Sequence, residues 1–218
     1  CPPCHHGLRR VDRHGRPRPP GHGLDNGHDA PLSRDHQYYV LAEAEGVSAE
    51  ADEERFLALV EAGLDSGGIA DAVVPKSGSE RDALWRIREE FDAALPAYIY
   101  DVSLPIRHMD DYVKHVEQDM KKRLPRSQPM CLGHLADGNL HFFISPGEEG
   151  DLHDAVNECV YDPLRPYGGS VSAEHGIGMD KIRWLPYSRS AADIELMHTL
   201  KRSLDPRNIL NPGRVVVP

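Results

Sequence analysis

From Gln37 onward, the apolar residues follow two spacings, one typical of helices and one typical of strands. In five stretches the apolar residues lie three or four positions apart, as a helix with one buried face requires. Runs of β-branched, aromatic and aliphatic residues lie between these stretches. We predict helices that begin after Ser48 and after Ser77, and further helices at 110–124, 151–164 and 191–204. We predict strands at 38–43, 70–74, 98–104, 129–135, 140–145 and 170–173.

The dipeptide Asp137-Gly138 separates two of these predicted strands. It is favoured in a two-residue type I′ turn, which joins antiparallel strands. With the loop closed there, His134 lies directly opposite His141. Alternating strands and helices can also form a doubly wound parallel sheet, but a two-residue turn excludes a purely parallel one. We therefore predict an α+β fold.

Composition and charge narrow the class of protein. The chain has 218 residues and a formal net charge of −10, which argues against a surface that binds nucleic acid or anionic membranes. It contains no run of about 18 apolar residues and no visible secretory signal, so we expect no membrane span. Its four cysteines do not form a disulfide framework. We expect a soluble, cytoplasmic protein.

Residues 1–36 differ in composition from the rest of the chain. They contain six of the 18 prolines, six of the 13 histidines and few apolar residues. Such a segment buries too little apolar surface to offset the entropy of ordering. Cys1 and Cys4 with the adjacent histidines resemble part of a zinc motif, but a structural zinc site needs a second ligand pair. We interpret 1–36 as an irregular or disordered segment of artefactual origin, and 37–218 as the folded domain.

Two short stretches, 133–141 and 170–178, contain side chains suited to catalysis. On facing strands, His134 and His141 can bind one transition metal, and Glu174 offers a carboxylate as a third ligand. The adjacent His175 would remain available for proton transfer. The alternatives are histidines with a structural role, or a metal-dependent hydrolase that activates water at the same three ligands. Spacing alone does not choose between these interpretations.

Three motifs occur in one order along the chain, at 133–141, 168–178 and 204–213. Together they resemble the C-terminal domain of FAD-linked oxidases of the D-2-hydroxyacid dehydrogenase group. That group includes D-lactate, glycolate-oxidase-subunit and D-2-hydroxyglutarate dehydrogenases. The resemblance runs from about Tyr38 to Val216. It implies an antiparallel sheet covered by helices, with ferredoxin-like βαβ units, and a small 2-hydroxy acid as the substrate.

The resemblance also implies roles for individual residues. A divalent metal, for which we expect zinc, is implied at His134, His141 and Glu174. His175 is implied as the base that removes the substrate's hydroxyl proton while hydride leaves for the flavin. A further contact is implied between Asn211 and the flavin, although Asn211 could instead be an ordinary polar residue of the tail.

Arg88 matches a position that binds a substrate carboxylate in the hydroxyglutarate enzymes, and its alternative role is a surface ion pair. Two departures from those enzymes concern the substrate: Ile99 replaces a lysine, and Phe143 replaces a residue that is often asparagine. Both point to a substrate with an apolar or shorter side chain. For Asn139, a role in the turn is favoured over a contact with ligand.

The glycine-rich, FAD-binding domain of the family is absent from this chain. We therefore expect a flavin-binding domain as a partner, FAD as the cofactor, and no activity from the chain alone. The alternative is a non-catalytic fragment that binds metal or small acids. A homodimer is a further expectation.

Overall fold

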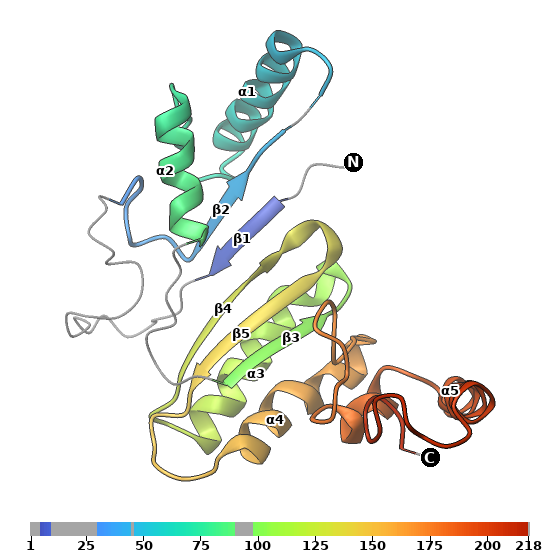
Figure 1. Ribbon diagram of the computed structural model, residues 1–218. Helices are drawn as coiled ribbons and strands as arrows, with labels where there is room; N and C mark the ends of the chain where they lie inside the picture. The colour runs from blue at the N-terminus through green and yellow to red at the C-terminus, as the bar shows by residue number, and fades with distance from the viewer. Residues whose placement is uncertain (1–4, 10–29, 45, 90–97, 218) are drawn as a thin grey trace. The chain divides into compact units, whose positions relative to one another are not determined.

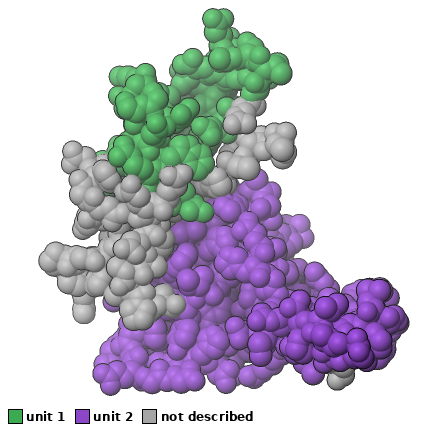
Figure 2. All heavy atoms as spheres, viewed as in Figure 1, with its two compact units in different colours: residues 1–96 green, residues 97–218 purple. Residues whose placement is uncertain are grey.

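The structure, a computed structural model, describes residues 5–9, 30–44, 46–89 and 98–217. Its contacts divide the chain into two compact units, residues 1–96 and residues 97–218 (Figures 1 and 2). Each unit is described by itself. Most of the segment 1–36, which we interpret as irregular, lies outside the described residues, so that interpretation stays a prediction.

The first unit contains two antiparallel strands followed by two helices. β1 (His5–Arg9) pairs with β2 (Tyr38–Ala42), which confirms the strand predicted at 38–43. The helices α1 (Ala49–Asp65) and α2 (Gly78–Glu89) begin where Ser48 and Ser77 predict. At the start of α2, Ser77 Oγ accepts the N–H of Glu80 at 3.2 Å, which satisfies one of the unpaired donors of the first helical turn.

The strand predicted at 70–74 is wrong. In the described part of the chain this segment has no strand pairing, and Val73 and Val74 are 45% and 38% exposed. Asp71 Oδ1 accepts the N–H of Ala72 at 2.8 Å, a local bond that competes with pairing between strands. Two valines without a surface to bury them do not form a strand.

The second unit contains a three-stranded antiparallel sheet. β5 (Asn139–Ser145) lies between β4 (Gln128–His134) and β3 (Tyr98–Ser103) and is antiparallel to both. β3 and β4 therefore run parallel to each other on either side of β5, and α3 (Met109–Arg123) connects them. Figure 1 shows α3 and α4 (His153–Tyr161) on the same side of the sheet. The α+β prediction is confirmed, whereas the ferredoxin-like units stay a prediction.

Two predicted elements near the C-terminal end are shorter than expected. The helix predicted at 151–164 ends as α4 at Tyr161, and the chain continues as a 3₁₀-helix over Asp162–Tyr167. Prolines inside that segment remove the N–H donors that an α-helix needs. The strand predicted at 170–173 is a single bridge between Ser103 and Ser170. The chain turns immediately afterwards, so this segment leads into a loop.

The last helix, α5 (Ala191–Leu204), has the predicted bounds. Its start is fixed by a capping box in which Ser190 Oγ accepts the N–H of Asp193, and the Asp193 carboxylate accepts the N–H of Ser190. No helix in the described ranges is long and apolar enough to cross a membrane.

The core of the second unit lies between the sheet and the helices. Successive residues of a strand point to opposite faces, and the face covered by helices is apolar. Its fully buried side chains from the sheet are Tyr100, Val102, Phe142 and Ile144. The opposite face holds three buried polar side chains, Asp101, Asn139 and His141. The predicted ligand His141 therefore lies on the face of the sheet away from the helices.

Replacing Phe142 by alanine is expected to lower the free energy of unfolding by about 3–5 kcal/mol. The Phe142 ring is fully buried and its centroid lies 5.9 Å from that of Tyr112, edge to face, so truncation leaves a cavity in the core. Urea unfolding of the 218-residue chain measures the loss. Phe143→Ala, on the opposite face and only half-buried, is the matched control and should lose less. Equal losses would contradict this assignment of faces.

The turn between β4 and β5 differs from the prediction. Leu135–Asp137 forms a 3₁₀ turn, and the loop has four residues instead of two, so His134 pairs with Asn139 and Leu132 with His141. A type I′ turn needs positive φ at both central residues, but here it is found at Gly138 alone, at 72°. An added Cβ at Gly138 would lie 2.2 Å from the Leu104 carbonyl oxygen, which explains the glycine.

Candidate metal and substrate site

Three predicted ligand side chains converge on the open face of the second unit. His134 lies at the end of β4, His141 lies in β5, and Glu174 lies in the loop that follows Ser170. His134 Nδ1 is 3.3 Å from Glu174 Oε1, and His141 Nε2 is 3.9 Å from Glu174 Oε2. One donor atom from each of the three residues lies within 4.8 Å of the other two.

The two histidines meet diagonally across the strands, and the predicted direct pairing is wrong. His141 lies two residues beyond Asn139, the partner of His134, so the side chains of both histidines point to the same face. Their ring centroids are 5.6 Å apart and the ring planes are nearly perpendicular, at 81°. The predicted proximity of the two rings is thus confirmed with a different register.

The donor set fits a divalent cation such as zinc. Two imidazoles and one carboxylate are common zinc ligands, and three protein ligands leave a coordination position open for substrate. Burial, together with the neighbouring His134 and His175, lowers the pKa of His141 below its usual value although the carboxylates of Asp101 and Glu174 act to raise it. Its imidazole is therefore held in the neutral form, the form that binds metal. The ligand roles themselves stay predictions.

Asp101 shapes the loop that carries Glu174. Its side chain is fully buried in β3, and its Oδ2 accepts hydrogen bonds from the backbone N–H groups of Ala173, Glu174 and His175, at 3.0, 2.9 and 2.7 Å. The hydroxyl of Ser172 donates to the same oxygen at 3.0 Å. Four donors on one oxygen wrap the loop around this carboxylate.

Sequence reasoning missed Asp101, although a signal was present. Within the predicted strand 98–104 it is the single charged residue, and a charged residue in a buried strand is rarely without a role. Burial by itself would raise the pKa of this carboxyl. The N–H groups of His175 and Glu174, the Ser172 hydroxyl and the Lys181 ammonium together hold the pKa below its usual value.

His175 lies beside the ligand set. Its ring stacks on that of His141, with centroids 5.6 Å apart and an interplanar angle of 29°, and its side chain is exposed. Gly176 follows with φ of 79°, so the chain turns sharply after His175, as the glycine predicts. Asp101, His141 and His175 form a second group that could hold a metal, and it shares His141 with the first.

Two buried side chains at the site have atoms without a hydrogen-bond partner in the described part of the chain. These atoms are Asp101 Oδ1 and both polar atoms of the Asn139 amide. The turn role favoured for Asn139 is wrong, because the side chain that makes the turn bond is Asp137, whose Oδ1 accepts the N–H of Asn139 at 3.1 Å. Buried polar atoms without a partner are costly, and they are commonly satisfied by ligand or solvent.

Comparison with known proteins assigns the family. Residues 18–215 match the family model described as FAD linked oxidases, C-terminal domain. The chain belongs to this family. The resemblance of the three motifs is thereby confirmed. In this member of the family, His134, His141 and Glu174 converge.

Relatives of this FAD-linked oxidase domain carry names of 2-hydroxyacid dehydrogenases. The chain is 33% identical over 195 residues to a D-2-hydroxyglutarate dehydrogenase of Stutzerimonas stutzeri, covering 85% of this chain and 42% of that protein. A mitochondrial D-2-hydroxyglutarate dehydrogenase of Arabidopsis thaliana is 35% identical over 192 residues, covering 85% and 34%. A Schizosaccharomyces pombe protein provisionally named a mitochondrial D-lactate dehydrogenase is 35% identical over 209 residues, covering 88% and 39%. The chain thus spans less than half the length of each of these relatives.

The structure does not test the predicted roles of two further residues, Arg88 and Asn211. Arg88 lies on α2, in the first unit, and its role in binding a substrate carboxylate stays a prediction. Asn211 is exposed, with φ of 46°, in the segment after α5. Its contact with the flavin likewise stays a prediction.

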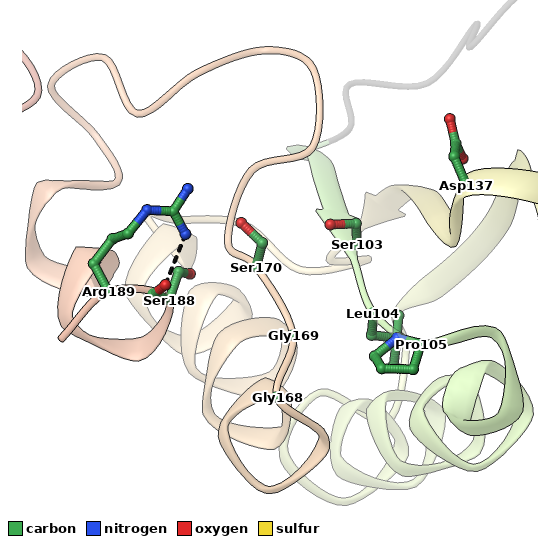
Figure 3. Close-up of a pocket in the computed structure, with 9 residues that line it drawn as sticks. All are labelled: Ser103, Leu104, Pro105, Asp137, Gly168, Gly169, Ser170, Ser188 and Arg189. Carbon is green, nitrogen blue, oxygen red and sulfur yellow. Dashed lines mark hydrogen bonds between the residues drawn. The ribbon is translucent and has the colours of Figure 1, made fainter. Parts of the chain in front are cut away.

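An open cavity of about 320 Å³ lies in the second unit (Figure 3). It is lined by Ser103, Leu104, Pro105, Asp137, Gly168, Gly169, Ser170, Ser188 and Arg189. Arg189 Nη1 donates to the Ser188 carbonyl oxygen at 2.7 Å, so part of this guanidinium is engaged locally. Asp137 and Arg189 contribute one charge of each sign, and no predicted metal ligand lines the cavity. We therefore assign the site to the histidine cluster.

Proposed function

We propose that the chain is the substrate- and metal-binding domain of an FAD-dependent oxidoreductase that oxidises a D-2-hydroxy acid to the 2-oxo acid. The observation that carries the proposal is the convergence of His134, His141 and Glu174 beside His175, in a domain of the FAD-linked oxidase family. FAD, held mostly by a domain outside this chain, would accept the hydride of the substrate's α-carbon.

We propose that His134, His141 and Glu174 hold a divalent cation, with zinc the expected ion. Bound there, the cation would polarise the substrate's α-hydroxyl and lower its pKa. The two strands fix the histidines, and the Asp101-centred loop fixes Glu174, so the three ligands need little rearrangement. A fixed substrate keeps its α-C–H bond directed towards the flavin.

His175 is proposed as the base. Its ring lies beside His141 and is open to solvent, where it can reach a hydroxyl bound at the neighbouring metal position. The imidazole takes the hydroxyl proton while the α-carbon gives up its hydride, and the C–O single bond becomes the carbonyl of the 2-oxo acid. Histidine is the side chain most often used for such a proton transfer near pH 7.

The proposed substrate has a short, apolar side chain. Ile99 pairs with Phe143 across β3 and β5, one pair along the same face from Asp101 and His141. Met130 pairs with Phe143 from the other side. Ile99, Phe143 and Met130 form an apolar wall beside the histidines, and none of these three described residues offers a cation to a second substrate carboxylate. We therefore favour D-lactate over D-2-hydroxyglutarate.

Titration calorimetry of the zinc-loaded 218-residue chain tests the proposal with D-lactate, L-lactate and D-2-hydroxyglutarate. D-lactate is expected to bind, and EDTA treatment should abolish the binding. Dye reduction driven by D-lactate should appear when the flavin-binding domain of a relative is supplied with FAD. A chain that binds metal and acids but supports no reduction in that assay would be a non-catalytic binding fragment. Absence of metal-dependent acid binding would contradict the proposal directly.

The partner and the location are also proposals. A flavin-binding domain is the expected partner, and the family membership supports it. A homodimer and a cytoplasmic location remain our expectations, and sedimentation and cell fractionation would test them.

A further inference from the structure

We propose that Asp101 is a positioning residue that sets the protonation of His141: its Oδ1 accepts a hydrogen bond from His141 Nδ1–H, which leaves Nε2 free to bind metal. This inference deepens the proposed function and rests on it for the identity of the ligand set. It concerns a residue of β3 that neither the three motifs nor the predicted ligand set contains.

The two oxygens of Asp101 have different surroundings. Oδ2 accepts the four hydrogen bonds from residues 172–175 described above. Oδ1 is buried and has no hydrogen-bond partner among the described residues. A buried carboxylate oxygen needs a donor, because its loss of hydration is otherwise uncompensated. One oxygen thus holds the loop, and the other is available to a neighbour.

His141 is the neighbour that faces this oxygen. Asp101 and His141 are direct partners in the pairing of β3 with β5, and His141 Nδ1 lies 3.9 Å from Asp101 Oδ1. A movement of about 1 Å closes that gap to a charge-assisted hydrogen bond. The opposite ring atom, Nε2, faces Glu174 at 3.9 Å. A neutral imidazole carries one proton, so a proton on Nδ1 leaves the lone pair on the side of Glu174 and His134.

A direct bond from Asp101 to the metal is the rival arrangement, with His141 and His175 as the other ligands. The ring planes of these two histidines are within 29° of parallel and the rings are stacked. Nitrogen lone pairs lie in the ring plane, so stacked rings do not direct them to a common point. The rings of His134 and His141 are close to perpendicular, at 81°, and can do so. The geometry therefore favours Asp101 as a hydrogen-bond acceptor for Nδ1 of His141, on the side of the ring opposite to Nε2. A carboxylate that accepts from the second nitrogen orients metal-bound histidines in many sites.

The variant Asp101→Asn separates the two functions of the carboxylate. An amide has one acceptor and one donor group. Four donors already point at the Oδ2 position, so the amide oxygen must take that position and the amide NH₂ must face His141 Nδ1. His141 then accepts at Nδ1 and carries its proton on Nε2, the atom required for metal binding. The loop is retained while the tautomer is reversed.

We would record long-range ¹⁵N–¹H spectra of the ¹⁵N-labelled chain and measure zinc affinity against a chromophoric chelator. The wild type should show His141 protonated on Nδ1 both with and without zinc. Asp101→Asn should move the proton to Nε2 and weaken zinc binding by about 10–100-fold. Ser172→Ala removes one donor from Oδ2 and leaves Oδ1 untouched, so it should retain the wild-type tautomer and lose far less zinc affinity than Asp101→Asn.

Several results would overturn the proposal. A proton on Nε2 of His141 in the wild type would overturn it. This measurement needs no variant, so it remains decisive if Asp101→Asn fails to fold. If Ser172→Ala weakened zinc binding as much as Asp101→Asn, the role of Asp101 would be to stabilise the loop alone. Equal zinc loss in Asp101→Asn and His175→Ala would make Asp101 a direct ligand. A wild-type chain that binds no zinc would refute the proposed metal centre, whereas the tautomer of His141 would still decide the role of Asp101.

Discussion

Replacing His175 by alanine is expected to lower the turnover of the intact enzyme by about 10²–10⁴-fold while the bound metal stays in place. The intact enzyme here means this domain together with the proposed flavin-binding domain. The expectation follows from geometry: Glu174 is directed at His134 and His141, whereas the exposed ring of His175 stacks on that of His141. Removing its ring takes away the proposed base without taking away a ligand of the favoured set.

Dye reduction gives the turnover and elemental analysis gives the metal content of the His175→Ala enzyme. A partial recovery at high pH is expected, because hydroxide can replace the missing base. His115→Ala, on the exposed surface of α3, is the matched control and should behave as the wild type. If His175→Ala loses its metal, and excess metal restores its turnover, then His175 is a ligand and the base lies elsewhere.

Replacing His134 by alanine is expected to abolish stoichiometric metal binding. Structural zinc sites with four ligands bind with about 10–16 kcal/mol, so one ligand contributes roughly 3 kcal/mol, or more than about 100-fold in affinity. Only His141 and Glu174 of the favoured set would remain. Both can still approach an ion, but two ligands do not compete with water and buffer at micromolar metal.

Equilibrium dialysis with zinc, followed by elemental analysis, measures this loss in the 218-residue chain. His198→Ala on α5, outside both candidate ligand groups, is the matched control and should retain full zinc content. An unchanged zinc content in His134→Ala would locate the metal elsewhere. The group formed by Asp101, His141 and His175 would then be the first alternative to test.

The elements that the sequence predicts well are those whose local signals agree. For α5, a regular apolar spacing, a capping serine and a three-residue offset to Asp193 all indicate the same start, and the helix has the predicted bounds. The segment 70–74 had only two β-branched residues, Val73 and Val74, in its favour. A strand also requires a neighbouring strand to pair with, and a sequence of five residues does not show whether one is available.

The site was predicted in part because its ligands lie in short motifs, whereas its supports do not. The expected turn chemistry was wrong, yet His134 and His141 still share a face, because the four-residue loop and the two-residue loop differ by an even shift in pairing. Asp101 could not be connected to the loop at 172–175 from sequence, since that contact depends on the bridge that places Ser170 beside Ser103 of β3. Local patterns identify ligands, and tertiary pairing identifies what orients them.

The hydrogen bond from His175 N–H to Asp101 joins residues 74 positions apart. A peptide cut to the two histidine-containing motifs would contain every proposed ligand and the proposed base, but it would have no acceptor around which the second motif could close. The loop at 172–175 therefore depends on long-range folding: it acquires its shape when the first strand of the unit joins the sheet. To transfer this site to another scaffold, one would have to transfer the paired strands β3, β4 and β5 together, including Asp101 of β3.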